Sequence, residues 1–405
     1  MVKYREIIFG LLILFFLAFS FYPTIFEINN ANKLTDPNRE FVLEHNYYWP
    51  DFNLYLSKIR QGWEGSLLAQ EKYTSEPHTG SLLQEFYVIL GRVGAVLFLD
   101  PNMSYQLGRF ILSPLLLVII LFLVRAYFHS FVWQVLAFAI VVVSASFPRI
   151  FYDSAGAIQI GRFMEWWSNI DALQRITFIP HILFGQVVSF YLLNQLTIKR
   201  TQLIKVKLIL FILLGNLVGL VFPPSLITLN GVLILILFAK LISSLKITNS
   251  IGLLGYWVIG LFVIFTLPSL LYLFIITKQI PWSALIEAHR THPMMVPLDQ
   301  YILGTGPIFY LGIFGAVVSI LKREKRFQPL ILWIITTLGF AAFFSVVKDQ
   351  SPLRFTQTGL FIPLGILGAY LFQKIFTAIT NIKSRLKNFL VISYLLSLIS
   401  YSTSS

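Results

Sequence analysis

The chain consists mainly of long apolar stretches separated by short polar segments. Many of these stretches approach the roughly 20 residues that an α-helix needs to cross about 30 Å of hydrocarbon. The sequence therefore predicts an all-α polytopic membrane protein, with a single transmembrane domain over residues 1–405 and about eleven membrane-spanning helices. The predicted spans cover residues 7–27, 106–124, 131–148, 176–196, 206–222, 225–243, 251–276, 300–321, 328–347, 355–376 and 387–401.

Composition supports the membrane class and excludes several others. Hydrophobic residues make up 57% of the chain and charged residues 12%, whereas soluble domains carry roughly 25% charged residues. The net charge of +13 does not indicate nucleic-acid binding, because the Lys and Arg residues lie mostly between the apolar stretches. The absence of cysteine excludes disulfides and thiol chemistry.

The distribution of charge predicts an orientation. Basic residues cluster in alternate connections, and of the 18 acidic residues only Glu6 and Glu324 share that side. Because cytoplasmic loops are enriched in Lys and Arg, we predict a cytoplasmic N-terminus in a plasma (inner) membrane. The larger loops on the other side carry most of the remaining ionisable groups, so we expect an extracytoplasmic active site.

The first extracytoplasmic loop, residues 28–105, is long enough to carry helices of its own. Phe52, Tyr55 and Ile59 have the spacing of one helical face, and Gly62 suits the end of that helix. This pattern predicts an amphipathic helix on the membrane surface with its aromatic rings at headgroup depth. A second interfacial helix is expected over residues 80–99.

Two carboxylates in this loop are candidate catalytic residues. Asp51 begins the first amphipathic helix, where it acts either as an N-cap or as a general base held at the membrane surface. Glu76 lies in a tight turn beside His78, either as a solvated turn residue or as a second catalytic carboxylate. His78 is a candidate substrate or lid residue, although its surroundings show no metal-ligand spacing.

Four basic residues are candidate ligands for a phosphate at the membrane interface. Arg109, Arg175, His181 and Arg354 all lie at the predicted outer ends of spans. Arginine offers a planar fork of donors to phosphate, but interfacial anchoring and snorkelling explain such positions equally well. His289 and His292 lie in a loop before the small-residue sequence Gly304-Thr305-Gly306-Pro307, which indicates either a mobile lid or a plain connector.

Three short sequences, combined with this architecture, resemble one group of membrane enzymes. They are Pro50-Asp51-Phe-x-x-Tyr55-Leu-Ser-x-Ile59-Arg60-Gln-Gly62, Glu76-Pro77-His78-Thr79-Gly80 and Ser351-Pro352-Leu353-Arg354-Phe355. Together with the long first outer loop, they resemble a bacterial group within the GT-C superfamily of polyprenyl-phosphate-sugar-dependent glycosyltransferases. That superfamily includes the protein mannosyltransferases and the bacterial aminoarabinose transferases. The resemblance covers most of the chain in architecture and few residues in detail.

The resemblance implies a mechanism. In that superfamily, a carboxylate of the first loop deprotonates the acceptor hydroxyl, and basic residues hold the lipid-linked phosphate. Asp51 would then be the base of an inverting transfer, and Arg354 a phosphate ligand. The implied partners are a polyprenyl-phosphate-linked sugar, membrane lipids and an acceptor that is a glycan, a lipid or a protein. No cofactor is indicated with certainty, and a divalent metal stays open.

The sequence departs from the superfamily pattern in two places. Many relatives carry an adjacent Asp-Glu pair close to the first span, whereas Phe52 follows Asp51 here. Trp166-Trp167 is followed by Ser168, so the Trp-Trp-Asp motif of oligosaccharyltransferases is missing. The second departure argues against glycosylation of peptide asparagine.

Two other function classes remain open from the sequence. A membrane transporter or lipid flippase is favoured by the polar residues Asn216 and Asn230 and by the break at Pro223-Pro224. The nearly charge-free centres of the spans argue against it. A polysaccharide polymerase or ligase would more often carry its large outer loop late in the chain.

Overall fold

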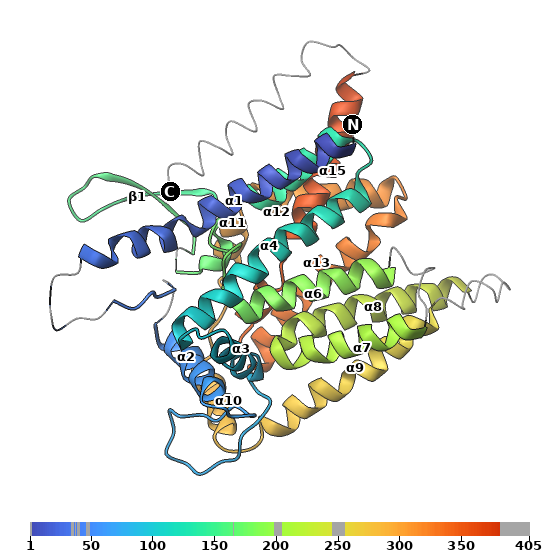
Figure 1. The fold of residues 1–405 in the computed structure, drawn as a ribbon. Helices are drawn as coiled ribbons and strands as arrows, with labels where there is room; N and C mark the ends of the chain where they lie inside the picture. The colour runs from blue at the N-terminus through green and yellow to red at the C-terminus, as the bar shows by residue number, and fades with distance from the viewer. Residues whose placement is uncertain are drawn as a thin grey trace.

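The computed structural model describes residues 2–33, 36, 38, 41–45, 49–164, 166–197, 205–244 and 256–380. These residues form mainly helices, drawn in Figure 1. In chain order the α-helices are α1 (Val2–Asn30), α2 (Trp49–Trp63), α3 (Glu85–Val96), α4 (Pro101–Tyr127), α5 (Phe131–Val143), α6 (Pro180–Thr197), α7 (Lys205–Val221), α8 (Pro223–Ser244), α9 (Trp257–Ile276), α10 (Trp282–Thr291), α11 (Leu298–Thr305), α12 (Pro307–Leu321), α13 (Gln328–Val347), α14 (Leu353–Thr356) and α15 (Phe361–Thr380). Short 3-10 helices cover Ala31–Lys33, Ser168–Ile170 and Lys325–Phe327.

The helices agree with a membrane protein but not with the expected number of spans. Within the described residues, six helices are long and apolar enough to cross a bilayer, and a bent pair, α11 and α12, raises this to seven. Helix α5 and the apolar part of α7 are shorter apolar segments. The eleven predicted spans are therefore not confirmed. The last of them, residues 387–401, lies outside the described residues.

Small residues allow the helices of the bundle to approach closely. A Cβ atom at Gly215 or Gly219 of α7 would overlap the side chains of Thr266 and Ser269 on α9. One at Gly315 of α12 would lie 2.0 Å from the carbonyl oxygen of Leu367 on α15. Because lipid supplies no hydrophobic driving force between helices, such close backbone contacts stabilise bundles within membranes.

Ion pairs mark one end of the bundle. Glu6 on α1 lies 2.9 Å from Arg125 near the end of α4, and Glu324 lies 3.0 Å from Lys374 on α15. The two acids that the sequence assigns to the cytoplasmic side thus pair with bases assigned to that side. Figure 1 places α2, α3 and α10 at the opposite end, which we call the loop end.

The predicted helices of the first loop are present, but their aromatic residues face the protein. Helix α2 corresponds to the predicted amphipathic helix and α3 to the second one. Phe52, Tyr55 and Ile59 are buried in the main hydrophobic core. The expectation that this face rests against lipid at the membrane surface is therefore wrong, because a helical face that fits lipid fits a protein interior equally well.

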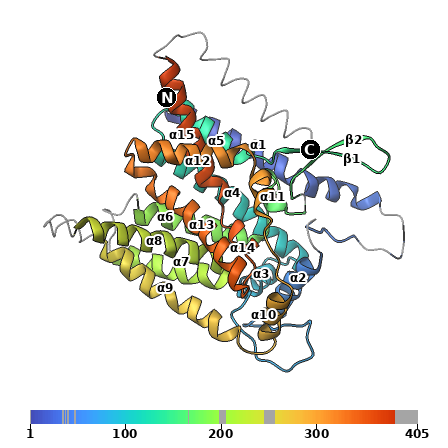
Figure 2. The same ribbon diagram turned by 180° about the vertical axis from the view of Figure 1, so that it is seen from behind.

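A β-hairpin interrupts the otherwise helical fold. Strands β1 (Pro148–Tyr152) and β2 (Ile158–Arg162) pair in antiparallel register between α5 and α6. The sequence analysis did not predict them. Figure 2 shows the hairpin projecting from the bundle on the side of α1.

Candidate active site

Helix α2 places Asp51 at the loop end in its first turn. The buried face of α2 packs on α3 and α4, because Tyr55 stacks on Tyr87 of α3 with ring centroids 4.4 Å apart. Asp51 itself is half-buried, and its carboxylate accepts no hydrogen bond from any residue that the structure describes. An N-cap role, which requires such a bond, is therefore not supported there.

Arg354 has an exposed side chain, and buried residues next to it in the sequence fix its position. Arg354 belongs to the short helix α14, whose Phe355 is buried and stacks on Phe344 of α13 at 5.1 Å. The indole nitrogen of Trp167 donates to the hydroxyl of Thr356 over 3.0 Å. Among the described residues, the guanidinium of Arg354 makes no hydrogen bond and no ion pair. A rigid support thus presents a cation without a partner.

The charge of Arg354 reaches three candidate residues from three other helices. It acts on Asp51 of α2, on His181 of α6 and on His289 of α10. Burial raises the pKa of the Asp51 carboxyl, and the nearby Arg354 guanidinium opposes that rise. Burial and then the charge of Arg354 lower the pKa of His289. Segments far apart in the sequence therefore bring four predicted site residues to one place.

A tyrosine fixes the ring of His181. The Tyr87 hydroxyl lies 2.7 Å from Nδ1 of His181, and burial raises the pKa of Tyr87 well above its ordinary value. Tyr87 therefore keeps its proton, and where its hydroxyl donates a hydrogen bond to Nδ1, the ring proton of His181 lies on Nε2. The sequence analysis missed Tyr87 as a site residue. No short motif marks it, because its role depends on the packing of α3 against α6.

Helix α10 is attached to the segment that carries Arg354. Nε of Arg290 donates to Asp349 over 2.8 Å, so α10 is tied to the loop that precedes Arg354. His289 precedes this arginine, and His292 at the end of α10 is exposed, with Nδ1 3.0 Å from the Thr291 hydroxyl. His289 lies within reach of the Arg354 charge. Arg290 and Asp349 are additional residues that the sequence analysis did not assign to the site.

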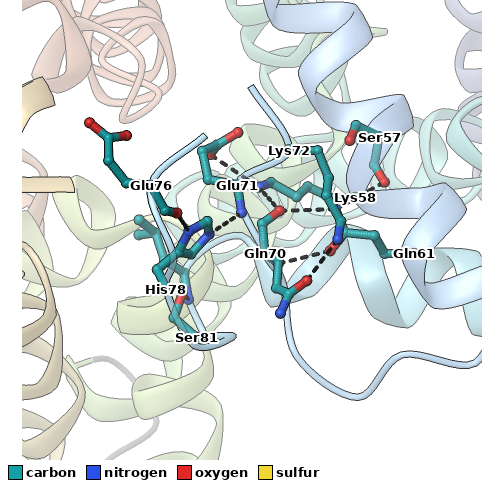
Figure 3. Close-up of polar contacts among 10 residues, drawn as sticks. Ser57, Lys58, Gln61, Gln70, Glu71, Lys72, Glu76, His78 and Ser81 are labelled. Atoms are coloured by element: carbon teal, nitrogen blue, oxygen red, sulfur yellow. Dashed lines mark hydrogen bonds and ion pairs between the residues drawn. The ribbon is translucent and has the colours of Figure 1, made fainter. Parts of the chain in front are cut away.

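Glu76 and His78 belong to a separate polar cluster, shown in Figure 3. His78 accepts the backbone N–H of Glu71 at Nε2 and donates from Nδ1 to the carbonyl of Glu76, both over 2.8 Å. Both ring nitrogens are thus occupied within the loop. The Glu76 carboxylate is exposed and points away from the cluster in Figure 3.

Lys58 and Gln61 hold the rest of this cluster on α2. The buried ammonium of Lys58 lies 3.0 Å from Glu71, and the Gln61 amide both donates to and accepts from the backbone of Gln70. Burial lowers the pKa of Lys58, and the Glu71 carboxylate opposes that shift. The cluster fixes the shape of residues 58–78, and the structure brings neither Glu76 nor His78 to Arg354.

Arg109 and Arg175 are buried and bound by neighbouring residues, although Nε of Arg175 has no hydrogen-bond partner among the described residues. Arg109 donates to the carbonyl of Thr177 and to the side chain of Gln106, over 2.8 and 2.7 Å. Arg175 donates from Nη2 to the carbonyls of Val141 and Val142, near the end of α5. A cation at a helix C-terminus is favourable because the last carbonyls lack intrahelical partners. Both arginines hold helices together in this structure.

Metal binding and known relatives add nothing to this geometry. Among the residues that the structure describes, no group of three or more His, Asp or Glu side chains is arranged to hold a metal ion. No protein-family model matches the chain, and no curated protein matches it.

Proposed function

We propose that the protein transfers a sugar from a polyprenyl-phosphate donor to an acceptor hydroxyl, at the membrane surface of its loop end. The observation that carries this proposal is that the charge of Arg354 acts on Asp51, His181 and His289, while Arg354 pairs with no described residue. The resemblance to the GT-C superfamily adds the donor class and the extracytoplasmic location.

Asp51 is the base in this proposal. Its carboxylate takes the proton of the acceptor hydroxyl while that oxygen attacks the anomeric carbon of the sugar. The bond to the phosphate oxygen breaks on the opposite face, so the configuration inverts. Burial raises the pKa of Asp51, which brings the carboxyl closer to the range where a general base is effective.

Arg354 receives the departing phosphate. The bond-breaking electron pair passes to the phosphate oxygen, and the guanidinium can donate two parallel hydrogen bonds to the growing negative charge. Since Arg354 makes no hydrogen bond or ion pair with any described residue, its donors are available to a ligand. In this proposal, His181 donates a hydrogen bond from Nε2 to the phosphate. His289 is part of α10, which covers one side of the site.

The depth of the site fits a lipid donor. A polyprenyl tail must remain in hydrocarbon while its phosphate lies at headgroup level. The apolar spans α4, α8 and α9 each have one end at the loop end, where the ionisable residues gather. A base at this level meets both a membrane-bound donor and a water-borne acceptor.

Asp51→Asn tests this function. Membranes that contain the variant are supplied with radiolabelled polyprenyl-phosphate sugars, and donor consumption is measured. We expect a loss of about 10²–10⁴-fold, because a positioned general base contributes roughly that factor. Glu76→Gln, in the same loop, is the matched control and should leave the rate unchanged. Normal turnover by Asp51→Asn would refute the proposed mechanism.

A transporter or lipid flippase is the second candidate, and one observation favours it. Helices α11 and α12 meet at an angle of 87°, and broken helices are typical of transporters. Gly306, with φ 79° and only 1.8 Å between its would-be Cβ and the Ala145 carbonyl oxygen, makes this bend. Movement of unaltered donor lipid across proteoliposomes, equal in wild type and Asp51→Asn, would favour that function.

A further inference from the structure

The hairpin of β1 and β2 has one face that is apolar except at its base, where Pro148 pairs with Arg162. Residues that face each other across antiparallel strands share one side of the sheet, and the register pairs Ile150 with Ile160 and Tyr152 with Ile158. These four side chains are 68%, 69%, 72% and 64% exposed, respectively. The opposite face carries Arg149, Phe151, Gln159 and Gly161. No described part of the chain covers the apolar face.

The hairpin is held in shape at both ends. At its base, the backbone N–H of Phe147 donates to Leu303 over 2.9 Å, and Arg162 forms an ion pair with Asp171. At its tip, the Asp153 carboxylate accepts hydrogen bonds from the backbone of Ala155 and Ala157. An isolated two-stranded hairpin is at best marginally stable in water, so an apolar face presented in this way indicates a partner.

Lipid is the partner that the surroundings of the hairpin favour. Both figures draw the hairpin beside the second half of α1, whose side chains Phe15, Phe19, Tyr22 and Phe26 are exposed and apolar. Because α1 is long and apolar enough to span the membrane, these side chains face hydrocarbon, and the hairpin extends the same surface. Strands of five residues reach only about 17 Å, too short to cross about 30 Å of hydrocarbon.

The opposite face of the hairpin suits the headgroup level. Arg149 is exposed and lies over the ring of Phe151, 5.8 Å from its centroid. A long, exposed guanidinium side chain on this face can extend to lipid phosphates while the isoleucines of the other face lie in the acyl chains. We propose that residues 148–162 form an interfacial anchor whose apolar face lies at the headgroup–acyl boundary of the leaflet at the loop end.

A single fluorophore on either face tests this anchor. The chain contains no cysteine, so one introduced cysteine accepts a thiol-reactive NBD label at that position alone. Ile160→Cys labels the apolar face and Gln159→Cys, its neighbour, labels the opposite one. The labelled full-length proteins are reconstituted in phosphatidylcholine–phosphatidylglycerol vesicles with or without lipids that carry a doxyl quencher near the headgroup.

We expect the label at position 160 to emit at shorter wavelength than the label at 159 and to lose more intensity with the quencher. Water-like emission at both positions, without quenching, would overturn the proposal. A shielded label at 160 that ignores the quencher and changes with the protein-to-lipid ratio would instead indicate a second copy of the chain, and would also overturn it. Size-exclusion profiles matching wild type confirm that both labelled proteins are folded.

Discussion

Arg354 and Arg175 both lie at predicted outer ends of spans, and they occupy opposite environments. The guanidinium of Arg175 is buried, donates to two carbonyls and the Ser144 hydroxyl, and lies 4.3 Å from the Phe361 ring centroid. That of Arg354 is exposed and has no partner among the described residues, yet its charge reaches three ionisable side chains. A cation that donates to buried carbonyls stabilises the fold, whereas one that makes no hydrogen bond or ion pair with any described residue is available to a ligand.

The same contrast separates the two candidate carboxylates. Asp51 is half-buried, and burial raises its pKa. It lies within reach of the charge of Arg354, which makes no ion pair with any described residue. Glu76 is exposed, and its neighbour His78 has both nitrogens occupied within the loop. Of these two carboxylates, Asp51 therefore fits the base of the proposed reaction better than Glu76 does.

Replacing Arg354 should have the largest effect after Asp51. We expect Arg354→Gln to lower kcat for donor turnover by about 10²–10³-fold, comparable to the loss of one donor that stabilises developing charge. Arg354→Lys keeps the charge but loses the planar fork, so its kcat should lie between those of Arg354→Gln and wild type. Steady-state kinetics with a labelled donor measures both, and an unchanged rate in Arg354→Gln would remove the distinction from Arg175.

The residual activity of these variants also reports on Asp51. Because Arg354 lowers the pKa of Asp51, its removal should move the acid limb of the pH–rate profile to higher pH. The limb moves in this direction because Asp51 acts as a base only when it is ionised, and a higher pKa delays ionisation to higher pH. Arg354→Lys should leave the limb in place, and a shift in the lysine variant as large as in the glutamine variant would argue against a charge effect.

Arg175→Met should affect stability instead of chemistry. It removes charged hydrogen bonds to the end of α5, each worth about 1.5–3 kcal/mol. We expect a lower unfolding temperature in detergent and a nearly normal KM for the donor in the folded fraction. A normal unfolding temperature combined with a raised KM would place Arg175 at the phosphate.

Replacing Glu85 should have the smallest effect, a change in how the unfolding temperature depends on pH. Burial raises its pKa to about 7, and one of its carboxylate oxygens is buried without a partner. The folded state therefore favours the protonated form, and the resulting stability is lost as pH rises from the ordinary value of 4.5 through about 7. Glu85→Gln should unfold at the wild-type temperature at pH 5 and at a higher one at pH 8. Equal temperatures at both pH values would contradict this.

The sequence predicted helices better than their surroundings. Apolar length located α1, α4, α8 and α9, since length alone decides whether a helix can span a membrane. It did not show that α2 turns Phe52 and Tyr55 into the protein, because lipid-facing and core-facing patterns are alike. The hairpin left a signal: β-forming residues Ile150–Tyr152 before the turn sequence Asp153-Ser154-Ala155-Gly156, and alternating Ile158 and Ile160 after it, are typical of paired strands.

The sequence predicted the residue types of the candidate site and named several of its residues. It could not separate them from candidates that the fold uses for packing. Arg175 and Arg354 look equivalent in sequence because each lies next to a predicted span. The predicted third span continued to residue 148, but α5 ends at Val143, and its last carbonyls receive Arg175. Only tertiary packing separates occupied from available donors, and it also selects Tyr87 as the partner of His181.

Binding of polyprenyl phosphate, measured by native mass spectrometry, tests the central claim most directly, because it needs neither the sugar nor the acceptor. Arg60 is the matched control, an exposed arginine of α2 that is already paired with Glu64. We predict that wild type and Arg60→Gln bind the lipid equally and that Arg354→Gln binds it at least tenfold more weakly, a difference of about 1.4 kcal/mol. Equal binding by all three proteins would contradict the assignment of Arg354 as the open phosphate ligand.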